Sequence, residues 1–370
     1  MRNRTEHSFP DAVNVLRAFG IDVPAKFADV CAIYRASGFL YPQKSEPLEA
    51  FWPSIRQLWM HLMRVNPSLL IVGIEGRHKR STGAMWKSST NNWFVQHLAS
   101  DGDAYGTASL VMGAAAALYL PCETQGFQVW FRGDNKLPNR VFGMHILDGG
   151  GRNSDSALHT YNYCRLQKCD MQATQRSAFD VICCDETTAS IATSLISEVR
   201  GTAFANVEEF DRDPFLKGID SEFRREGLRR YRRIYVALKE NVPVGCAIAF
   251  RGPLGLNFSF LENRCDLVLK PGLSVSETAA ITQALLHAAR DAYADFEPAW
   301  IPVTTEVPQT RLPLSLRPLR VYTQAIYLRA AMPRFYDGLR DLYGRLLSRQ
   351  MRQDTAAMST GQVEAITTHY

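Results

Sequence analysis

A dense run of arginines is the strongest chemical signal in the sequence. Between Phe223 and Arg233 the chain places six arginines and interrupts them with one acid, Glu226. Guanidinium groups at this density favour an anion-binding surface for phosphate groups, an acidic carrier protein or tRNA. The alternative is a solvated or salt-bridged face that pairs with acids such as Glu208, Glu209 and Asp211. The arginines concerned are Arg224, Arg225, Arg229, Arg230, Arg232 and Arg233.

Histidine and cysteine supply the next candidates. His97 alternates with Trp93 and Val95 on a predicted strand, so we expect the three side chains on one face, where His97 is either a catalytic group in a cleft or a packed core histidine. The cysteines at 164, 169, 183 and 184 lack the paired spacing of a zinc site, and we expect no metal. The sequence contains no nucleophile elbow, Walker loop, HExxH or dinucleotide fingerprint, which argues against hydrolase, NTPase, metalloprotease and dehydrogenase classes.

Composition places the chain among globular proteins. Its 370 residues are 46% hydrophobic and 21% charged, with a net charge of +5, and this length favours two units of about 150 residues. No run reaches the roughly 18 apolar residues of a membrane span, and the first residues lack an apolar signal core. We therefore expect a cytoplasmic protein without a membrane span.

The elements that must position these residues follow from periodicity and turn signals. In the first half we expect helices over 51–63 and 105–120, strands over 69–74, 84–87, 93–98 and 127–131, and a further helix from 137. In the second half we expect strands over 178–184, 264–269 and 300–305, a helix over 187–199, and a hairpin over 234–250. Ser274 and Glu277 form a capping box that opens another helix. Residues 316–328 and 335–351 show helical spacing, and 353–370 reads as a frayed tail.

The polar, glycine-containing stretch 148–176 is the predicted linker. It divides the chain into an N-terminal domain over 1–147, a C-terminal domain over 177–334, and a terminal helix and tail over 335–370. Trp93 and Phe127 are 34 residues apart, as are Asp266 and Trp300, and each pair spans a predicted strand, helix and strand. The sequence therefore predicts two related halves.

The second half resembles the GNAT acyltransferase superfamily. The resemblance lies in the hairpin IYVALKENVPVGCAIAF, whose second strand opens V-G-x-A, and in the strand, capped helix and strand after it. In the first half, Asn135-x-x-Pro138-x-x-x-Phe142 is similar to a family pattern after the fifth strand. The resemblance implies an α/β (α+β) fold of two GNAT-like halves, each a mixed, mostly antiparallel sheet flanked by helices, as in tandem members of the superfamily.

The resemblance also implies an acyl-CoA co-substrate whose diphosphate binds a glycine-rich loop at the start of the central helix. Neither half has this loop intact. The first half offers residues 100–106, where Asp101 and Asp103 would repel an anion. The second half offers Lys270, Gly272 and Ser274, and we expect CoA there, with Arg229 and Arg230 as further phosphate ligands.

Two catalytic roles follow from the same resemblance. Glu262, just before the predicted fourth strand of the second half, is the candidate general base, and Tyr322 is the candidate acid for the leaving thiolate. Phe142 takes the corresponding position in the first half and has no proton to donate, so we expect that half to be degenerate. The predicted activity is acyl transfer from acyl-CoA or a carrier-bound donor to a small-molecule or protein amine, with an acyl carrier protein or tRNA as possible partners. The alternatives are a non-catalytic binding or regulatory protein on decayed halves, and an aminoacyl-tRNA-dependent transferase.

Overall fold

The computed structural model describes residues 8–66, 69–102, 104–120, 123–147, 151, 153–171 and 179–345. The predicted tail over 353–370, the end of the predicted terminal helix and both ends of the predicted linker lie outside these ranges. The helices are α1 (Ser8–Ala18), α2 (Phe27–Ala36), α3 (Pro42–Glu49), α4 (Trp52–Val65), α5 (Ala104–Tyr119), α6 (Lys136–Pro138), α7 (Met144–Leu147), α8 (Ala189–Arg200), α9 (Thr202–Val207), α10 (Lys217–Arg225) and α11 (Val275–Ala289), followed by a helix over 332–345.

Twelve described strands form one continuous sheet in the order β1-β2-β3-β4-β5-β12-β6-β11-β10-β9-β8-β7. Only β4 with β5 and β10 with β11 pair in parallel, and every other neighbouring pair in this sheet is antiparallel. The predicted fold class, an α/β protein with mixed and mostly antiparallel sheet flanked by helices, is confirmed. The strands are β1 (Ile21–Asp22), β2 (Leu70–Glu75), β3 (Ser81–Lys87), β4 (Asn92–Ser100), β5 (Gly126–Arg132), β6 (Ser156–Gln167), β7 (Asp180–Cys183), β8 (Tyr231–Lys239), β9 (Val242–Arg251), β10 (Cys265–Leu269), β11 (Trp300–Thr305) and β12 (Pro318–Leu328).

The two halves of the sheet follow the same plan. From one edge the order is β1 to β5 and then β12, and from the other edge it is β7 to β11 and then β6. In each half a helix, α5 or α11, connects the two parallel strands, as parallel pairing requires a crossover connection. Trp93 pairs directly with Phe127 in the first half, whereas Asp266 in the second half pairs with Thr304, four residues after Trp300. The two halves are therefore related in plan but not in every register.

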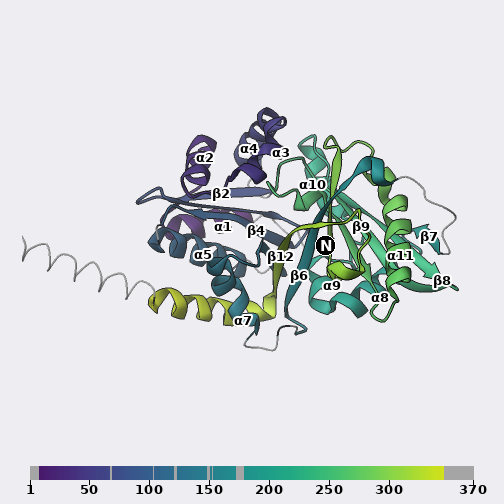
Figure 1. Ribbon diagram of the computed structural model, residues 1–370. Coiled ribbons are helices and arrows are strands. Elements are labelled where there is room, and N and C mark those ends of the chain that lie inside the picture. Colours follow the sequence, from purple (N-terminus) through teal and green to yellow (C-terminus); the bar gives the residue numbers. More distant parts are fainter. Residues whose placement is uncertain are drawn as a thin grey trace, which may run out of the picture.

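The two halves exchange their last strands. β6 follows β5 in the chain but pairs with β11 of the second half, and β12 follows β11 but pairs with β5 of the first half. β6 and β12 also pair with each other along most of their length, so they lie at the centre of the molecule (Figure 1). A side chain on β12 therefore lies beside β5, next to the strands of the first half, although β12 comes from the second half of the chain.

The structure corrects two expectations in this central region. The segment 316–328, predicted as a helix, is mostly strand β12, and the predicted linker contains the long strand β6. β12 has strands on both sides, and its residues from Tyr322 to Tyr327 are all buried. A strand buried on both faces lacks the alternation that marks a strand in sequence, and so cannot be told from a buried helix.

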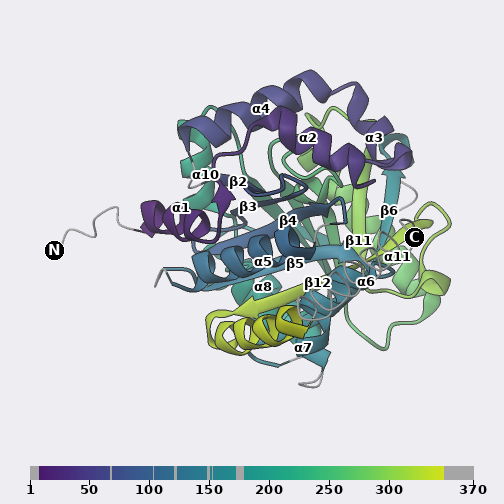
Figure 2. The ribbon, with the colours of Figure 1, turned by 90° about the vertical axis from the view of Figure 1, so that its left-hand side faces the viewer.

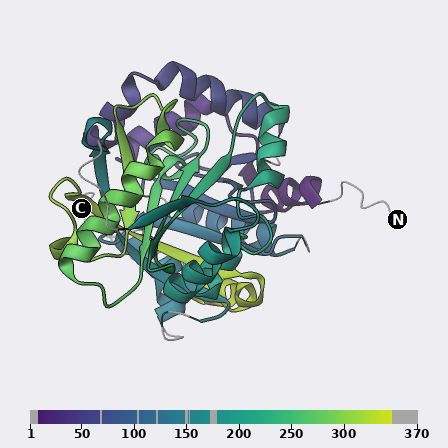
Figure 3. The same ribbon diagram turned by 90° about the vertical axis from the view of Figure 1, so that its right-hand side faces the viewer.

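Helices cover both faces of the first half's sheet. α1, α5 and the helix over 332–345 lie on one face, whereas α2 and α4 lie on the other (Figures 1 and 2). α8 and α11 pack on the strands of the second half, which faces the viewer in Figure 3, whereas α9 packs mainly on β12 and also contacts β5 and β6. Buried apolar side chains form two clusters, a smaller one under α5 and a larger one that continues from α2 and α4 into the second half. The continuity of the larger cluster joins the halves into one body.

Candidate functional site

The site begins where β4 and β5 separate. These parallel strands pair over three positions only, from Asn92 with Gly126 to Phe94 with Gln128. Beyond them the Gln96 carboxamide replaces the missing backbone ladder: its nitrogen donates to the Trp130 carbonyl (3.2 Å) and its oxygen accepts from the Trp130 N–H (2.6 Å). Past this bridge a cavity of about 570 Å³ opens between the carboxyl ends of the two strands, the usual place for a ligand at parallel strands.

A β-bulge in β4 shapes the cavity. Ala84 pairs with Gln96 and Thr82 with Ala99, so Gly83 lies opposite two residues, His97 and Leu98. His97 adopts a left-handed conformation with φ of 56°, which is uncommon outside glycine and re-aims a side chain at such a bulge. The expectation that His97 shares a face with Trp93 and Val95 is therefore wrong, because the extra residue turns it to the opposite face.

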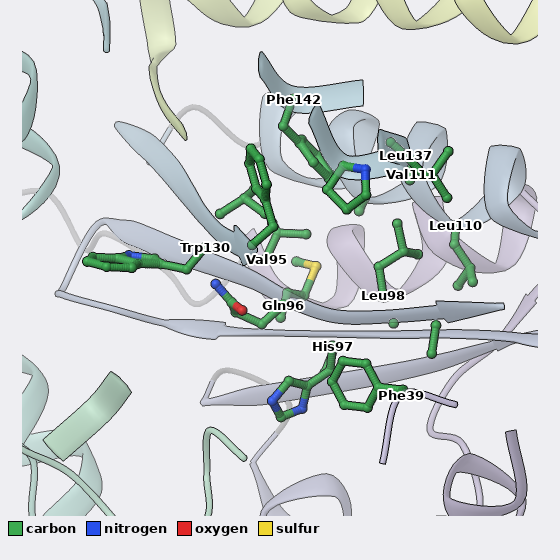
Figure 4. A pocket seen from close by; sticks show the side chains of 18 of the residues that line it. Phe39, Val95, Gln96, His97, Leu98, Leu110, Val111, Trp130, Leu137 and Phe142 are labelled. Atoms are coloured by element: carbon green, nitrogen blue, oxygen red, sulfur yellow. The ribbon is translucent and has the colours of Figure 1, made fainter. Parts of the chain in front are cut away.

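The wall of the cavity under α5 is apolar. In Figure 4, Val95 and Leu98 point to the same side of the strands as Leu110, Val111 and Phe142, while His97 and Phe39 lie on the other side. An aliphatic and aromatic wall of this kind favours an extended apolar arm, because it removes apolar surface of the ligand from water. Further apolar residues of this wall are Leu16, Ile21, Met85, Leu118, Val129, Leu137 and Phe335.

Hydroxyl groups lie on the opposite side of the cavity. Tyr322, on the exchanged strand β12, donates from its hydroxyl to Ser259 Oγ over 3.0 Å, and both residues line the cavity. Burial raises the pKa of Tyr322 above its usual value, so its proton is retained at neutral pH and is available to donate. Tyr322 was expected in the second half's cleft, but the strand exchange places it at the cleft of the first half.

His97 holds the loop that carries Ser259. Its Nε2 accepts from the Phe258 N–H (3.2 Å), and its ring stacks on Trp59 at 5.4 Å between centroids. Burial, with the Lys44 charge as a lesser cause, lowers the pKa of His97 well below its usual value, so the imidazole is neutral. Because the Nε2 lone pair is already engaged, His97 cannot remove a proton through this nitrogen. The geometry fits a positioning role better than the predicted catalytic one.

Glu262 is buried inside the protein and is not among the residues that line this cavity. Its exposed fraction is 2%; Oε1 accepts from Trp86 Nε1 (2.7 Å), and Oε2 forms an ion pair with Arg230 Nη1. Arg230, also 2% exposed, donates from Nε and Nη2 to the Ser88 carbonyl (3.1 and 2.9 Å). The predicted base and the predicted phosphate ligand thus bind each other and tie the second half to the β3–β4 turn of the first. The structure contradicts a solvent-facing role for either residue.

The remaining arginines of the cluster divide between core and surface. Arg232 is buried against Glu208 (3.5 Å) and donates to the Asp213 carbonyl, as the salt-bridged alternative predicted for Glu208. Arg224 and Arg229 both pair with Asp220, at 2.7 and 3.1 Å. Arg225 and Arg233 are exposed. The cluster therefore does not form one basic surface, since buried carboxylates and Asp220 neutralise most of it.

In the expected phosphate loop of the second half, the polar groups of Lys270 and Ser274 already bind other side chains of the protein. Ser274 Oγ accepts from the Glu277 N–H (3.2 Å), and Glu277 Oε2 accepts from the Ser274 N–H (2.9 Å), which confirms the predicted capping box. Lys270 pairs with Glu198 at 3.0 Å. Gly272 has φ of 85° in an open turn. Because the Glu277 carboxylate occupies the helix N-terminus, a diphosphate would meet a negative charge there, and these residues do not form the expected cradle.

The first half's loop is also a poor diphosphate site. α5 begins at Ala104 close to the cavity, which Ser100 lines. Asp101 forms an exposed ion pair with Arg80 (3.0 Å) and keeps a carboxylate at the approach to the helix, while Asp103 lies outside the described residues. The cavity thus fits an apolar ligand arm, whereas the described residues of neither loop fit the diphosphate of the expected CoA.

The mouth of the cavity is basic. Lys44 on α3, Tyr41 and Arg132 line it, and Arg320 donates from Nη1 to the Tyr41 hydroxyl (2.6 Å). Asn135 caps α6 by accepting from the Leu137 N–H (3.3 Å), and Phe142 lies in the apolar wall, so the residues behind the first-half resemblance do reach the site.

Sequence reasoning missed Lys44, Gln96 and Ser259. Asn257, whose Oδ1 accepts from the Ser259 N–H (2.7 Å), forms a local turn that its sequence spacing could have indicated. No pattern marks Lys44 or Gln96, because distant segments of the chain build the cavity that Lys44 lines, and the Trp130 backbone that Gln96 bonds lies 34 residues away.

Two further observations concern metals and membranes. Within the described residues, no group of three or more His, Cys, Asp or Glu side chains is arranged to hold a metal ion. No helix in the part of the chain that the structure describes is both long and apolar enough to cross a bilayer.

Several solved structures to which this chain is similar are described as acetyltransferases. No protein-family model and no curated protein matches the chain. A GCN5-related N-acetyltransferase-like protein from Streptococcus suis is similar at 15% identity, covering 82% of this chain and 99% of that one, with a TM-score of 0.40. A putative acetyltransferase from Pyrococcus horikoshii is similar at 10% identity (84% and 89% covered, TM-score 0.39). A tandem GNAT protein from the clavulanic acid biosynthesis pathway is similar at 11% identity (73% and 86%, 0.34). TM-scores this low establish neither family nor activity.

Proposed function

We propose that the protein is an acyltransferase that moves an acyl group from a thioester donor to an amine in the cleft between β4 and β5. The observation that carries the proposal is a cavity of about 570 Å³ that is lined both by an apolar wall and by the hydrogen-bonded hydroxyls of Tyr322 and Ser259. The apolar wall suits the donor's acyl or pantetheine-like arm, and the resemblance of the sequence to GNAT acyltransferases supports the same reaction. The acting cleft is that of the first half, which the sequence analysis expected to be degenerate.

The cleft favours direct attack. The amine nitrogen bonds to the thioester carbonyl carbon, the C–S bond breaks, and the electron pair of that bond leaves on sulfur. Tyr322 donates its proton to the thiolate, and the proton that the attacking nitrogen releases returns to Tyr322 through Ser259. Holding both reactants in one water-poor cavity supplies most of the acceleration, and the hydroxyl adds general acid catalysis.

The carrier of the donor is a separate question, because the described loops lack a diphosphate cradle. Calorimetric titration with acetyl-CoA, with a longer acyl-CoA and with an acylated carrier protein tests it directly. Thiol release in the presence of a panel of amines then tests turnover. Binding of a donor without turnover of any amine would favour the non-catalytic binding protein, and binding of none of the three would favour a tRNA-delivered donor.

Two variants test the chemistry. Tyr322→Phe should lower kcat by about 10²-fold or more with little change in donor affinity, since it removes only the proton. Leu98→Trp should fill the apolar wall and abolish donor binding. Tyr119→Phe and Leu120→Trp, at exposed positions outside the cavity, are the matched controls. Unchanged kcat in Tyr322→Phe would eliminate the assigned proton donor.

A further inference from the structure

The basic mouth of the cavity contains a buried ammonium group with no acid beside it. Lys44 is only 9% exposed and lines the cavity, and its Nζ lies 3.3 Å from the centre of the Phe39 ring. Among the residues that the structure describes, Nζ has no hydrogen-bond or ion-pair partner. A buried charge is costly unless it is paired, so the ring face alone compensates Lys44 poorly.

Two guanidinium groups add to this positive charge. Arg132 Cζ and Arg320 Cζ lie 5.8 and 5.9 Å from the centre of the Tyr41 ring, and Tyr41 is one helical turn before Lys44. Asp134 pairs with Arg132 through Nε at 3.0 Å. Within the described part of the chain, Arg320 has no carboxylate partner. The mouth therefore holds three cations and one acid.

The surplus charge acts on the groups around it. Burial first, and Arg320 and Arg132 second, lower the pKa of Lys44 well below its usual value. An anionic ligand would offset this repulsion and favour the ammonium form of Lys44. The same field would lower the pKa of an acceptor ammonium nearby and leave more of it as the free amine that acyl transfer requires.

We propose that the acceptor is an amine that also carries a carboxylate, and that this carboxylate binds Lys44 at the cavity mouth beside Tyr41 and Arg132. This inference rests on the proposed function. A carboxylate fits better than a phosphate, because Lys44 is, among the described residues, the cavity-lining cation without an acid partner. Arg132 is paired with Asp134, and Arg320 does not line the cavity. One ammonium neutralises a monoanion, whereas a dianion at Lys44 would keep an unpaired charge. Free amino acids and other amino-carboxylates are the substrate class.

The test is a binding measurement on three matched ligands without donor. Phenylalanine, phenylalaninamide and phenethylamine share one side chain and differ in the carboxylate, and the same triplet with leucine covers an aliphatic side chain. The wild type should bind the amino acid of at least one triplet about tenfold or more tightly than its amide and its amine. Lys44→Met should remove that preference and keep a wild-type melting temperature, since it replaces a buried charge by an apolar chain of similar length.

Lys136→Met is the matched control, because Lys136 is exposed on α6 near the same mouth. It should keep the preference. Equal binding of acid, amide and amine by the wild type, or a preference that survives in Lys44→Met, would overturn the inference, and tighter binding of phosphoethanolamine than of any amino acid would assign the site to phosphate instead.

Failure of this inference and failure of the proposed function give different results. Carboxylate-dependent binding that Lys44→Met abolishes, without thiol release from any donor, refutes acyl transfer and leaves the subsite in place. Thiol release that is equally fast with amines lacking a carboxylate refutes the subsite and leaves acyl transfer in place.

Discussion

Replacing Glu262 by glutamine separates a structural role from a catalytic one. In the wild type its two oxygens accept from Trp86 and Arg230, and all three side chains are buried. Glutamine can keep the Trp86 contact through its carbonyl oxygen. Its NH₂ group would then face the Arg230 guanidinium, donor against donor, and a buried positive charge would lose its counterion.

The magnitude follows from this geometry. Removing one partner of a buried ion pair costs about 3–5 kcal/mol, and the Glu262 and Arg230 side chains are 1% and 2% exposed, so little solvent screening reduces that cost. We expect Glu262→Gln to lower the free energy of unfolding by about 3–5 kcal/mol. The double variant Arg230→Met, Glu262→Leu removes both charges, so no buried charge of this pair is left unpaired. The Trp86 N–H and the Ser88 carbonyl then lose their hydrogen-bond partners, and each unsatisfied group costs about 1–3 kcal/mol.

Urea unfolding followed by tryptophan fluorescence measures these differences. Glu198→Gln, which breaks the partly exposed pair with Lys270, is the control and should cost less than about 1 kcal/mol. A kcat that falls by about 10²–10⁴-fold in Glu262→Gln while stability stays within 1 kcal/mol of wild type would refute the reasoning, because that is the signature of a general base.

Two further predictions concern protonation and the arginine cluster. Burial holds the pKa of His97 below its usual 6.5, so the unfolded chain takes up a proton below about pH 6.5 that the folded protein excludes. The stability that this residue contributes is fully present above pH 6.5 and declines on acidification by up to about 1.4 kcal/mol per pH unit; His97→Gln should show a shallower decline between pH 7 and 5, and parallel pH curves would contradict this. Arg225→Gln and Arg233→Gln should leave the urea midpoint nearly unchanged. Arg232→Gln removes the guanidinium that donates to the Asp213 and Pro214 carbonyls, while Glu208 keeps its ion pair with Arg264, and it should cost about 1–3 kcal/mol. Equal small losses for all three would indicate that Arg232 is solvated.

Much of the candidate site was out of reach of sequence reasoning. Tyr322 was identified by its residue type but was predicted on a helix, because the continuous run of buried residues in β12 lacks the alternation of a strand. It was also assigned to the wrong half, because β12 pairs with β5, almost 200 residues away. Glu262 and Arg230 were identified as charges available to a ligand, yet each is the other's partner across 32 residues of chain. A charge in sequence does not reveal whether another charge neutralises it in space.

The sequence by itself determined what depends on near neighbours. The Ser274–Glu277 capping box, the β8–β9 hairpin and the strand, helix and strand units around α5 and α11 all involve residues close along the chain, so their periodicity and turn residues specify them. Tertiary structure alone decided the exchange of β6 and β12, the bulge that turns His97, and the burial of Lys44 among arginines. Each of these depends on pairing between distant segments, where packing and the need to satisfy buried backbone and charge override local preference.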